Sequence, residues 1–343
     1  MCTRAKMITN DIKIDTKSSN EPRFPLPKIP EGWDTKPKTL GFFNVHTHSY
    51  FDRDEASSSL QKSVRRGYLD EAIQWGLEQF WAGPKAVVTN VWNRLLIMTV
   101  EDIGPADPYA IFYVNYCLND KHNYLSLCRA ISYLTMTKKT RVDDWSVNTY
   151  LSLGYNKREI PLKSDYPFNL QYDAFNSVIK ALKAKDVDQC IRMIVILLLR
   201  RDKKTYWSAF QSVVNDNYFN LLVNIAKPFA TGNKNEYILF QAHATMLFCY
   251  DKWPTVDTFK PLVNIPSDSD LDKIAAKVYQ RTELLGVMDD AADKHTKLGK
   301  KLGRGMEHFI TRGSIINNKD EFWSPIDKHY LDAFISIRGF KLQ

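Results

Sequence analysis

The sequence has few cysteines and no long hydrophobic run. Its five cysteines are spread over 343 residues without a C-x-x-C pair, which argues against a zinc knuckle or a disulfide-rich scaffold. The longest apolar run covers only the seven residues from Met193 to Leu199, whereas a membrane span needs about 20. The N-terminus lacks the apolar core of a secretory signal. We therefore expect an intracellular protein, in the cytoplasm, nucleoid or nucleus, without a membrane partner.

The sequence also lacks a phosphate-binding loop. No G-x-x-x-x-G-K-[ST] pattern occurs, because "GPKAVVTN" (83–90) has the wrong spacing and "GKKLGRG" (299–305) lacks the Ser or Thr that would hold magnesium. An intrinsic ATPase activity is therefore not expected. The sequence predicts no cofactor, no metal site and no enzymatic activity.

One sequence pattern, His-x-His, favours a metal site. His46 and His48 follow the apolar residues Phe42, Phe43 and Val45, and several metal-dependent hydrolases present their first two ligands in this way. Such a site needs further ligands converging from other strands, and alternation typical of strands is scarce here. We predict that this stretch leads into the first helix. An enzyme using His46 and His48, or His295 and His308, is the competing hypothesis.

Apolar and basic residues are plentiful. With 44% apolar and 13% aromatic residues, the chain can bury a sizeable core. There are 47 Lys and Arg residues against 39 Asp and Glu, giving a formal charge of +8. This surplus is mild for the length, so it allows contact with a polyanion such as DNA without requiring it.

Helical periodicity dominates from about residue 55 onward. Leu60 and Val64 recur at i, i+4, and Gly67 offers a helix stop. Before this region, the prolines between residues 22 and 37 predict an extended arm. We predict an all-α fold with four parts: a proline-rich arm (1–44), a helical bundle (45–155), a second, related bundle (156–260) and a C-terminal helical region (261–343).

Two pairs of segments suggest an internal repeat. Residues 55–73 and 173–191 match at an offset of 118, and "YLSLCRAISYL" (124–134) matches "YILFQAHATML" (237–247) at an offset of 113. The identical positions of the first pair are Ala56/Ala174, Ser59/Ser177, Lys62/Lys180, Asp70/Asp188 and Ile73/Ile191. Either the chain contains two similar helical units, or two amphipathic hairpins look alike by chance.

The first bundle resembles a known family. The matching strings are "SSSLQKSVRRGYLDEAIQWGLEQFWAG" (57–83), "VWNRLLIMTVEDIGPADPYAI" (91–111) and "LCRAISYLTMTKKTRVDDWSVNTY" (127–150). They resemble the C-terminal helical region of the replication-associated recombination AAA+ ATPases, clamp-loader relatives that include the Werner-helicase-interacting ATPase. The likeness covers under a third of the chain and does not include the AAA+ module.

In that family this region is the collar through which subunits oligomerise, so the resemblance implies a homo-oligomer. The expected interface residues are Trp75, Leu77, Phe80 and Trp92. A second set of residues, expected to form structural ion pairs without a catalytic part, comprises Arg65, Arg66, Arg94, Glu101 and Asp102. Glu101 and Asp102 lie at a predicted helix C-terminus, where the helix dipole is unfavourable for acids unless a basic partner is near.

The basic string "DAADKHTKLGKKLGRGMEHFITRG" (290–313) is the other notable stretch. On a continuous helix its cations form a stripe, for which the candidate nucleic-acid-binding residues are Lys297, Lys300, Lys301, Arg304 and His308. The glycines within it would allow close approach of a phosphate backbone or another helix. A similar string ends some stand-alone bacterial and viral relatives of the same helical region. The alternative is a solvated basic face on a helix that is docked by its leucines.

These observations lead to two functional hypotheses. The first is a non-ATPase protein associated with DNA replication, recombination or repair, which self-associates and contacts DNA or a replication complex. The alternative is a structural or minor virion protein of a large DNA virus or phage that has reused a collar module. In that case the proline-rich arm would tie neighbouring copies together.

Overall fold

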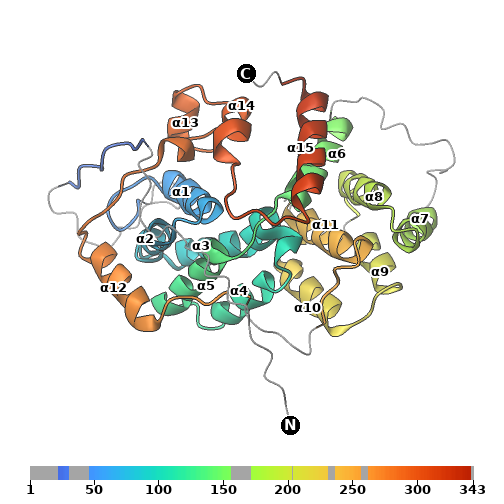
Figure 1. Cartoon of the computed structure of the whole chain (residues 1–343), viewed down its shortest axis with the longest axis horizontal. Coiled ribbons are helices and arrows are strands. Elements are labelled where there is room, and N and C mark those ends of the chain that lie inside the picture. Colours follow the sequence, from blue (N-terminus) through green and yellow to red (C-terminus); the bar gives the residue numbers. More distant parts are fainter. Residues whose placement is uncertain are drawn as a thin grey trace, which may run out of the picture.

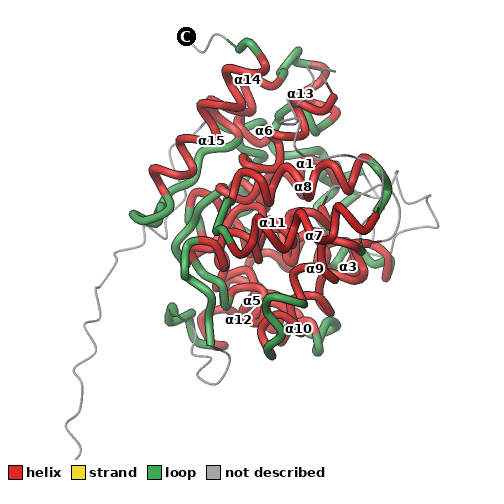
Figure 2. Tube along the Cα trace, turned by 90° about the vertical axis from the view of Figure 1, so that its right-hand side faces the viewer, coloured by secondary structure: helices red, strands yellow, loops and turns green. Residues whose placement is uncertain are grey.

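The computed structural model describes residues 22–30, 46–155, 171–202, 204–230, 236–255 and 262–340. This part of the chain consists of helices and loops, with isolated β-bridges and no strand, so the predicted all-α fold is confirmed (Figures 1 and 2). None of its helices combines the length and the apolar character that crossing a membrane requires.

The helices fall into two groups and a C-terminal region. The first group contains α1 (Arg53–Arg66), α2 (Leu69–Phe80), α3 (Lys85–Met98), the π-helix η2 (Thr99–Ile103), the 3-10 helix η3 (Gly104–Ala106), α4 (Ala110–Leu118), α5 (Tyr124–Met136) and α6 (Val142–Tyr155). The second contains α7 (Gln171–Lys183), α8 (Val187–Leu199), α9 (Thr205–Gln211), α10 (Asn217–Ala226), η4 (Lys227–Ala230) and α11 (Glu236–Cys249). The C-terminal region contains α12 (Asp268–Tyr279), η6 (Asp289–Ala291), α13 (Lys297–Lys301), α14 (Met306–His308), η7 (Phe309–Gly313) and α15 (Ser324–Arg338).

The C-terminal region returns to the first group. Helix α12 packs on α2, η6 and α13 pack on α1, and α15 packs on α6. Figure 1 shows α1, α2 and α12 at one end of the molecule and α7, α8 and α9 at the other, with α6, α10, α11 and α15 between them. Residues more than 200 positions apart in the sequence therefore meet around α1.

The first helical hairpin of each group keeps the register that the repeat predicts. Shifted by 118, α1 and α2 begin at the first residues of α7 and α8. The turns also correspond: the N–H groups of Gly67 and Tyr68 bind the carbonyls of Val64 and Ser63, and those of Lys185 and Asp186 bind Leu182 and Ala181. Gly67 and Lys185 both adopt a positive φ. Superposition of the complete bundles stays a prediction.

The predicted oligomer interface is wrong in its location. Trp75 and Leu77 are fully buried, Trp92 is 1% exposed, and Phe80 is partly buried against the same core. The ring of Phe51 packs edge-on against Trp75 at 4.9 Å. The aromatic density that suggested an interface is instead absorbed within the chain, because α1, α2, α3 and α5 enclose these rings.

Part of the predicted arm lies on the body. Arg23 forms an antiparallel bridge with Met288, and Phe24 donates its N–H to the carbonyl of Val287 at 2.9 Å. The Arg23 side chain also pairs with Glu71 of α2. A Cβ at Gly286 would stand 2.0 Å from the Phe24 carbonyl oxygen, so this approach requires glycine. Residues 1–21 and 31–44 of the predicted arm lie outside the described residues.

Candidate functional site

A buried ion-pair network lies between α1, η2, α6 and the C-terminal region. At its centre Arg65, which is fully buried, pairs with Asp102 at 2.6 Å and Glu101 at 3.0 Å. Arg65 also donates to the main-chain carbonyl of Gly313 at 2.7 Å. The guanidinium therefore joins η2 to η7, two elements that are distant in the sequence.

A second arginine holds the same carboxylates. Arg141, the residue before α6, approaches Asp102 at 3.4 Å and Glu101 at 3.5 Å, and it pairs with Asp144 in the first turn of α6. Burial raises the pKa of Glu101, but Arg65, Arg141 and Arg94 outweigh it, so the net pKa lies below its usual value. Arg94 thus acts on Glu101 by charge. Of the predicted ion-pair set, Arg65, Glu101 and Asp102 pair with one another.

Two further cations of α1, Arg66 and Lys62, bind the C-terminal region. Arg66 pairs with Asp290 at 2.5 Å and donates to the carbonyl of Arg312 at 2.9 Å, so its acidic partner is neither Glu101 nor Asp102. Lys62 pairs with Asp293, and its ammonium also donates to Ser58 at 2.9 Å. Asp290 and Asp293 lie three residues apart, and their partners Arg66 and Lys62 lie four residues apart on one face of α1. Both pairs can therefore form across the same contact.

Lys62 and Asp293 are almost completely removed from water, with side chains 2% and 0% exposed. Burial lowers the pKa of Lys62 to about 8, although Asp293 opposes this shift. Burial also pushes the pKa of Asp293 upward, but Lys62 prevails and holds it below its usual value. The pair is therefore ionic at neutral pH and links α1 to the C-terminal region.

Phe309 of η7 is the apolar element of this network. The cationic groups of Lys294, Arg141, Lys62 and Arg65 lie 4.9, 5.4, 5.6 and 5.7 Å from the centroid of its ring. A π-face attracts cations most strongly where water is excluded. Phe309 therefore fills the space between the cations without competing for their acids.

The basic stripe predicted for 290–313 does not lie on one helix. Helix α13 ends at Lys301, and Gly303 adopts a φ of +70° before α14 begins at Met306. The predicted single helix does not form, because Gly303 adopts a turn conformation and Gly299 lies against the main chain of Asp293. A Cβ at Gly299 would lie 1.8 Å from the carbonyl oxygen of Asp293, so the backbone that approaches this glycine belongs to the chain itself.

Of the five candidate nucleic-acid-binding residues, Arg304 is engaged internally and His308 is half-buried. Arg304 pairs with Asp289 at 2.5 Å and donates to the carbonyl of Ala292 at 3.0 Å. His308 lies near Asp289 and Asp290, and burial followed by the charge of Arg304 lowers its pKa. The Arg304 side chain is therefore not available to a phosphate in this conformation.

Asp289, Asp290 and His308 bring their ligand atoms within 4.8 Å of one another, which raises the question of a cation site. However, arginines already neutralise the two carboxylates. Arg304 pairs with Asp289, and Arg66 and Arg312 pair with Asp290. We assign this cluster to the structural network.

The other three candidates lie at the surface. Lys297, Lys300 and Lys301 are exposed on α13, and we call these three residues the basic tip. In the part of the chain that the structure describes, neither Lys300 nor Lys301 forms an ion pair, while Lys297 lies in the field of Glu55. No atom lies within 4 Å of a Cβ built at Gly303 or Gly305, so the surroundings are open.

The two histidines of the His-x-His pattern contact different partners. His46 stacks on Tyr50 with 4.2 Å between ring centroids, whereas His48 stacks on Tyr279 at 5.5 Å. The Nε2 atom of His48 also lies 3.0 Å from the main-chain oxygen of Tyr279. The loop is organised by the buried carboxylate of Glu78, which accepts from the Thr47 hydroxyl at 2.7 Å.

The sequence did not indicate the C-terminal acids of the network, Asp290 and Asp293. Lys62 lies in the string 57–83 and Asp293 in the basic string 290–313. Their pairing spans 231 positions, and no local pattern indicates it. One signal was present in the sequence: Ser58, Lys62, Arg65 and Arg66 share one face of a helix whose other face is apolar. A polar face of this kind is ordinarily solvated, so position alone would not have distinguished the two cases.

No protein-family model matches the chain, and neither the curated proteins nor the solved structures provide a match. The collar resemblance therefore stays an interpretation of the sequence.

Proposed function

We propose that this chain is a non-enzymatic DNA-contacting protein of the replication and recombination machinery, and that the basic tip is its phosphate contact. The observation that carries the proposal is the exposure of Lys300 and Lys301 without an acidic partner on a firmly held support. Exposed lysines bind phosphates through charge, and they need no fixed geometry to do so.

The support for the basic tip is the buried network. Thr296 caps α13 by accepting from the N–H of Gly299 at 2.9 Å, and Asp54 of α1 accepts from the N–H of Lys297 at 2.7 Å. Directly before this cap, Asp293 pairs with Lys62. The tip is therefore fixed to α1, so that binding would not require the segment to order.

Phosphate contacts carry no base information, so the proposed binding is independent of sequence and sensitive to salt. The assembly role that the resemblance implies is retained within this proposal, but its surface is not the one predicted. Trp75, Leu77 and Trp92 are core residues and cannot meet a second copy.

The test is charge reversal at Lys300 and Lys301. The variant Lys300→Glu with Lys301→Glu should weaken binding to every duplex alike, and the slope of log K against log salt should decrease by about 0.9 per lost contact. Titrations by fluorescence anisotropy across a salt series measure both quantities. The matched control is Lys273→Glu with Lys277→Glu, because both lysines are exposed on α12 and already pair with acids.

Equal affinities and slopes for the tip variant and wild type would contradict the proposal. So would an equal loss in the α12 control, because net charge alone would then explain the effect. Any tightening of binding at low pH through His308 should begin below pH 6.5, because the pKa of His308 is lowered.

A further inference from the structure

Two buried thiols meet where α8 packs on α11. Cys190 lies in the first turn of α8, and Cys249 is the last residue of α11. Cys190 is fully buried, and Cys249 is 8% exposed. Cys190 forms one side-chain hydrogen bond with Cys249 and another with Tyr206, whose hydroxyl oxygen lies 2.5 Å from that of Thr245. The two sulfur atoms are therefore neighbours in the interior.

The two thiols have different roles in this hydrogen bond. The bond with Cys249, followed by burial, raises the pKa of Cys190 well above its usual range. Cys190 therefore keeps its proton and donates it to the sulfur of Cys249. Because a thiolate, and not a thiol, attacks an oxidant, Cys249 is the better nucleophile of the pair.

An open pocket of about 440 Å³ reaches Cys249. Its walls also contain Asp188 of α8 together with His329 and Tyr330 of α15, and the Tyr330 hydroxyl donates to Asp188 at 2.8 Å. The pocket is wide enough for a small polar molecule, and Cys249 places its side chain in the wall. An oxidant that enters this pocket therefore meets Cys249 before Cys190.

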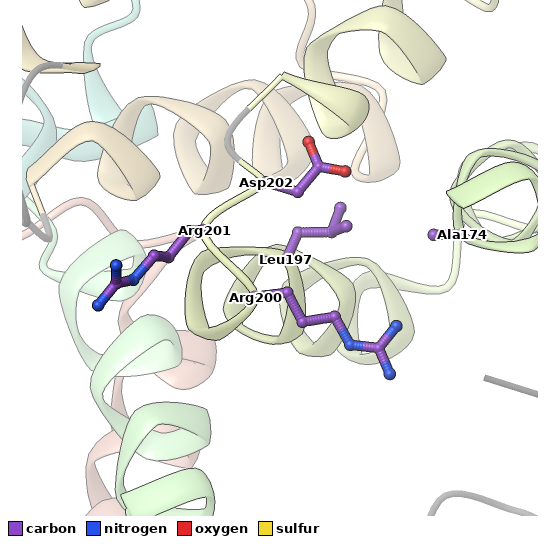
Figure 3. A pocket seen from close by; sticks show the side chains of 5 residues that line it. All are labelled: Ala174, Leu197, Arg200, Arg201 and Asp202. Carbon is purple, nitrogen blue, oxygen red and sulfur yellow. The ribbon is translucent and has the colours of Figure 1, made fainter. Parts of the chain in front are cut away.

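A second pocket, of about 410 Å³, lies at the opposite end of α8. Figure 3 shows the described residues that line it, which are Ala174, Leu197, Arg200, Arg201 and Asp202. None of these residues is a cysteine, and Cys190 lies in the first turn of the helix, away from this end. Of these two pockets, the one at Cys249 is therefore the one that leads to the thiols.

We propose that Cys190 and Cys249 are a reversible oxidation site, at which a hydroperoxide that enters the pocket converts the two thiols into a disulfide. In the first step Cys249 releases its proton to water, and its sulfur attacks one oxygen of the peroxide. The O–O bond breaks, and the departing hydroxide takes up a proton and leaves as water. Cys249 is then a sulfenic acid.

In the second step the sulfur of Cys190 attacks the sulfur of Cys249. The S–O bond breaks, and the departing hydroxide leaves as water with the proton of Cys190. The two thiols together lose two electrons and two protons, and hydrogen peroxide is reduced to two molecules of water. A thiol reductant reverses the change by thiol–disulfide exchange.

The geometry allows this bond with a short approach of the two side chains. A disulfide places its sulfur atoms about 2.05 Å apart, and these thiols are already hydrogen-bonded. The bond would fasten the end of α11 to α8 next to Tyr250, whose ring packs edge-on against Trp323 at 5.2 Å. Trp323 directly precedes α15, so oxidation would restrain the contact of the second helical group with the C-terminal region. This inference does not depend on DNA binding by the basic tip.

The test treats the folded, full-length chain with hydrogen peroxide in a Cys2→Ser background. The remaining thiols are then alkylated, and mass spectrometry of proteolytic peptides locates the bond. We expect a peptide pair linked through Cys190 and Cys249, which dithiothreitol separates again. The oxidised chain should also unfold at a temperature about 5 °C or more above that of the reduced chain, because the crosslink restricts the unfolded ensemble.

Single variants separate the roles of the two thiols. Cys190→Ala should leave Cys249 as a sulfenic acid that dimedone labels, because the second thiol is missing. Cys249→Ala should leave Cys190 as a thiol after the same treatment. Cys117 and Cys128 are internal controls that should remain thiols, since burial raises their pKa values to about 11 and about 12. Circular dichroism checks that the variants fold, and the result with the Cys2→Ser chain stands without them.

The proposal is overturned if the treated chain carries no bond between Cys190 and Cys249 while glutathione in a parallel sample is fully oxidised. It is also overturned if Cys249 proceeds to the sulfinic acid without bonding to Cys190. Oxidation of Cys117 and Cys128 at the same rate would overturn it as well, because oxidation would then follow opening of the fold and not entry through the pocket.

Discussion

Lys139 is a buried cation whose ammonium donates to main-chain carbonyls and not to an acid. Its ammonium is fully enclosed and donates to the main-chain carbonyls of Thr135 at 2.7 Å and Thr137 at 2.8 Å. Burial lowers the pKa of Lys139 to about 7, because the field of Asp102 compensates only in part. Each unit of such a shift corresponds to about 1.4 kcal/mol between the two protonation states.

The consequence is a stability that rises with pH. The folded protein releases the Lys139 proton near pH 7, whereas the unfolded chain keeps it until about pH 10.5. Between these values the unfolded chain binds more protons, so the free energy of unfolding increases with pH. Lys139→Met should flatten this rise between pH 7 and 9 by up to about 1.4 kcal/mol per pH unit. Urea unfolding at pH 7, 8 and 9 measures the slope.

The exposed Lys121→Met serves as the control. Lys62 adds a rise of the same sign above pH 8, because burial lowers its pKa as well, so some slope should remain in the Lys139 variant. Identical slopes for wild type and Lys139→Met would show that the ammonium stays charged in the interior.

At the scale of elements, the contact between α13 and the loop before it depends on one glycine. An alanine Cβ at Gly299 would overlap the Asp293 carbonyl, which is main chain and cannot rotate away. Gly299→Ala should therefore destabilise the fold by about 2 kcal/mol or more, in the range of overpacked cores. The change in the urea midpoint tests this prediction. Gly305→Ala, where no atom lies within 4 Å of the added Cβ, should stay within about 0.5 kcal/mol of wild type.

This glycine also shows which parts of the structure the sequence could predict. Leu60 and Val64 gave the helices correctly, because apolar periodicity reflects local geometry. The same reasoning extended one helix through 297–308. It failed because Gly299 lies against the carbonyl of Asp293, outside this segment, and because Gly303 ends the helix with a positive φ. Periodicity marks Trp75 as apolar, but it does not say whether the chain itself or a partner covers the ring.

The ion pairs also divide into those that the sequence indicates and those that only the tertiary fold forms. Arg65 could be matched with Glu101 and Asp102, which follow within 40 positions in one motif region. Its neighbour Lys62 could not be matched with Asp293, since that pairing arises only when the C-terminal region returns to α1. The sequence therefore indicated half of the candidate site, and the tertiary fold supplied the rest.

At the scale of the whole molecule, the first helical group depends on the C-terminal region. A chain that ends at residue 255 would lose Asp290 and Asp293 and leave Lys62 and Arg66 without these acids. Stranding a buried charge costs about 3–5 kcal/mol, and a domain has only about 5–15 kcal/mol in total. We expect the truncated chain to lack cooperative thermal unfolding by circular dichroism and to be cut rapidly by protease within α1.

The control is a chain that ends at Arg338, which keeps α15 and every ion pair of the network. If the chain ending at 255 instead melts cooperatively at the wild-type temperature, then the buried cations do not need their C-terminal partners.

The separation of 231 residues between Lys62 and Asp293 also has a consequence for synthesis. A ribosome adds about 5–20 residues per second, so α1 leaves the exit tunnel roughly 10–50 s before its partner is made. During that interval the Lys and Arg side chains of α1 remain hydrated, and α1 cannot pack fully against the rest of the fold. Contacts of such long range slow folding, because a large loop must close before they form. The nascent chain therefore passes through a long period in which α1 is open to chaperones, and a message truncated before the codon for Asp290 would yield a product that never leaves that state.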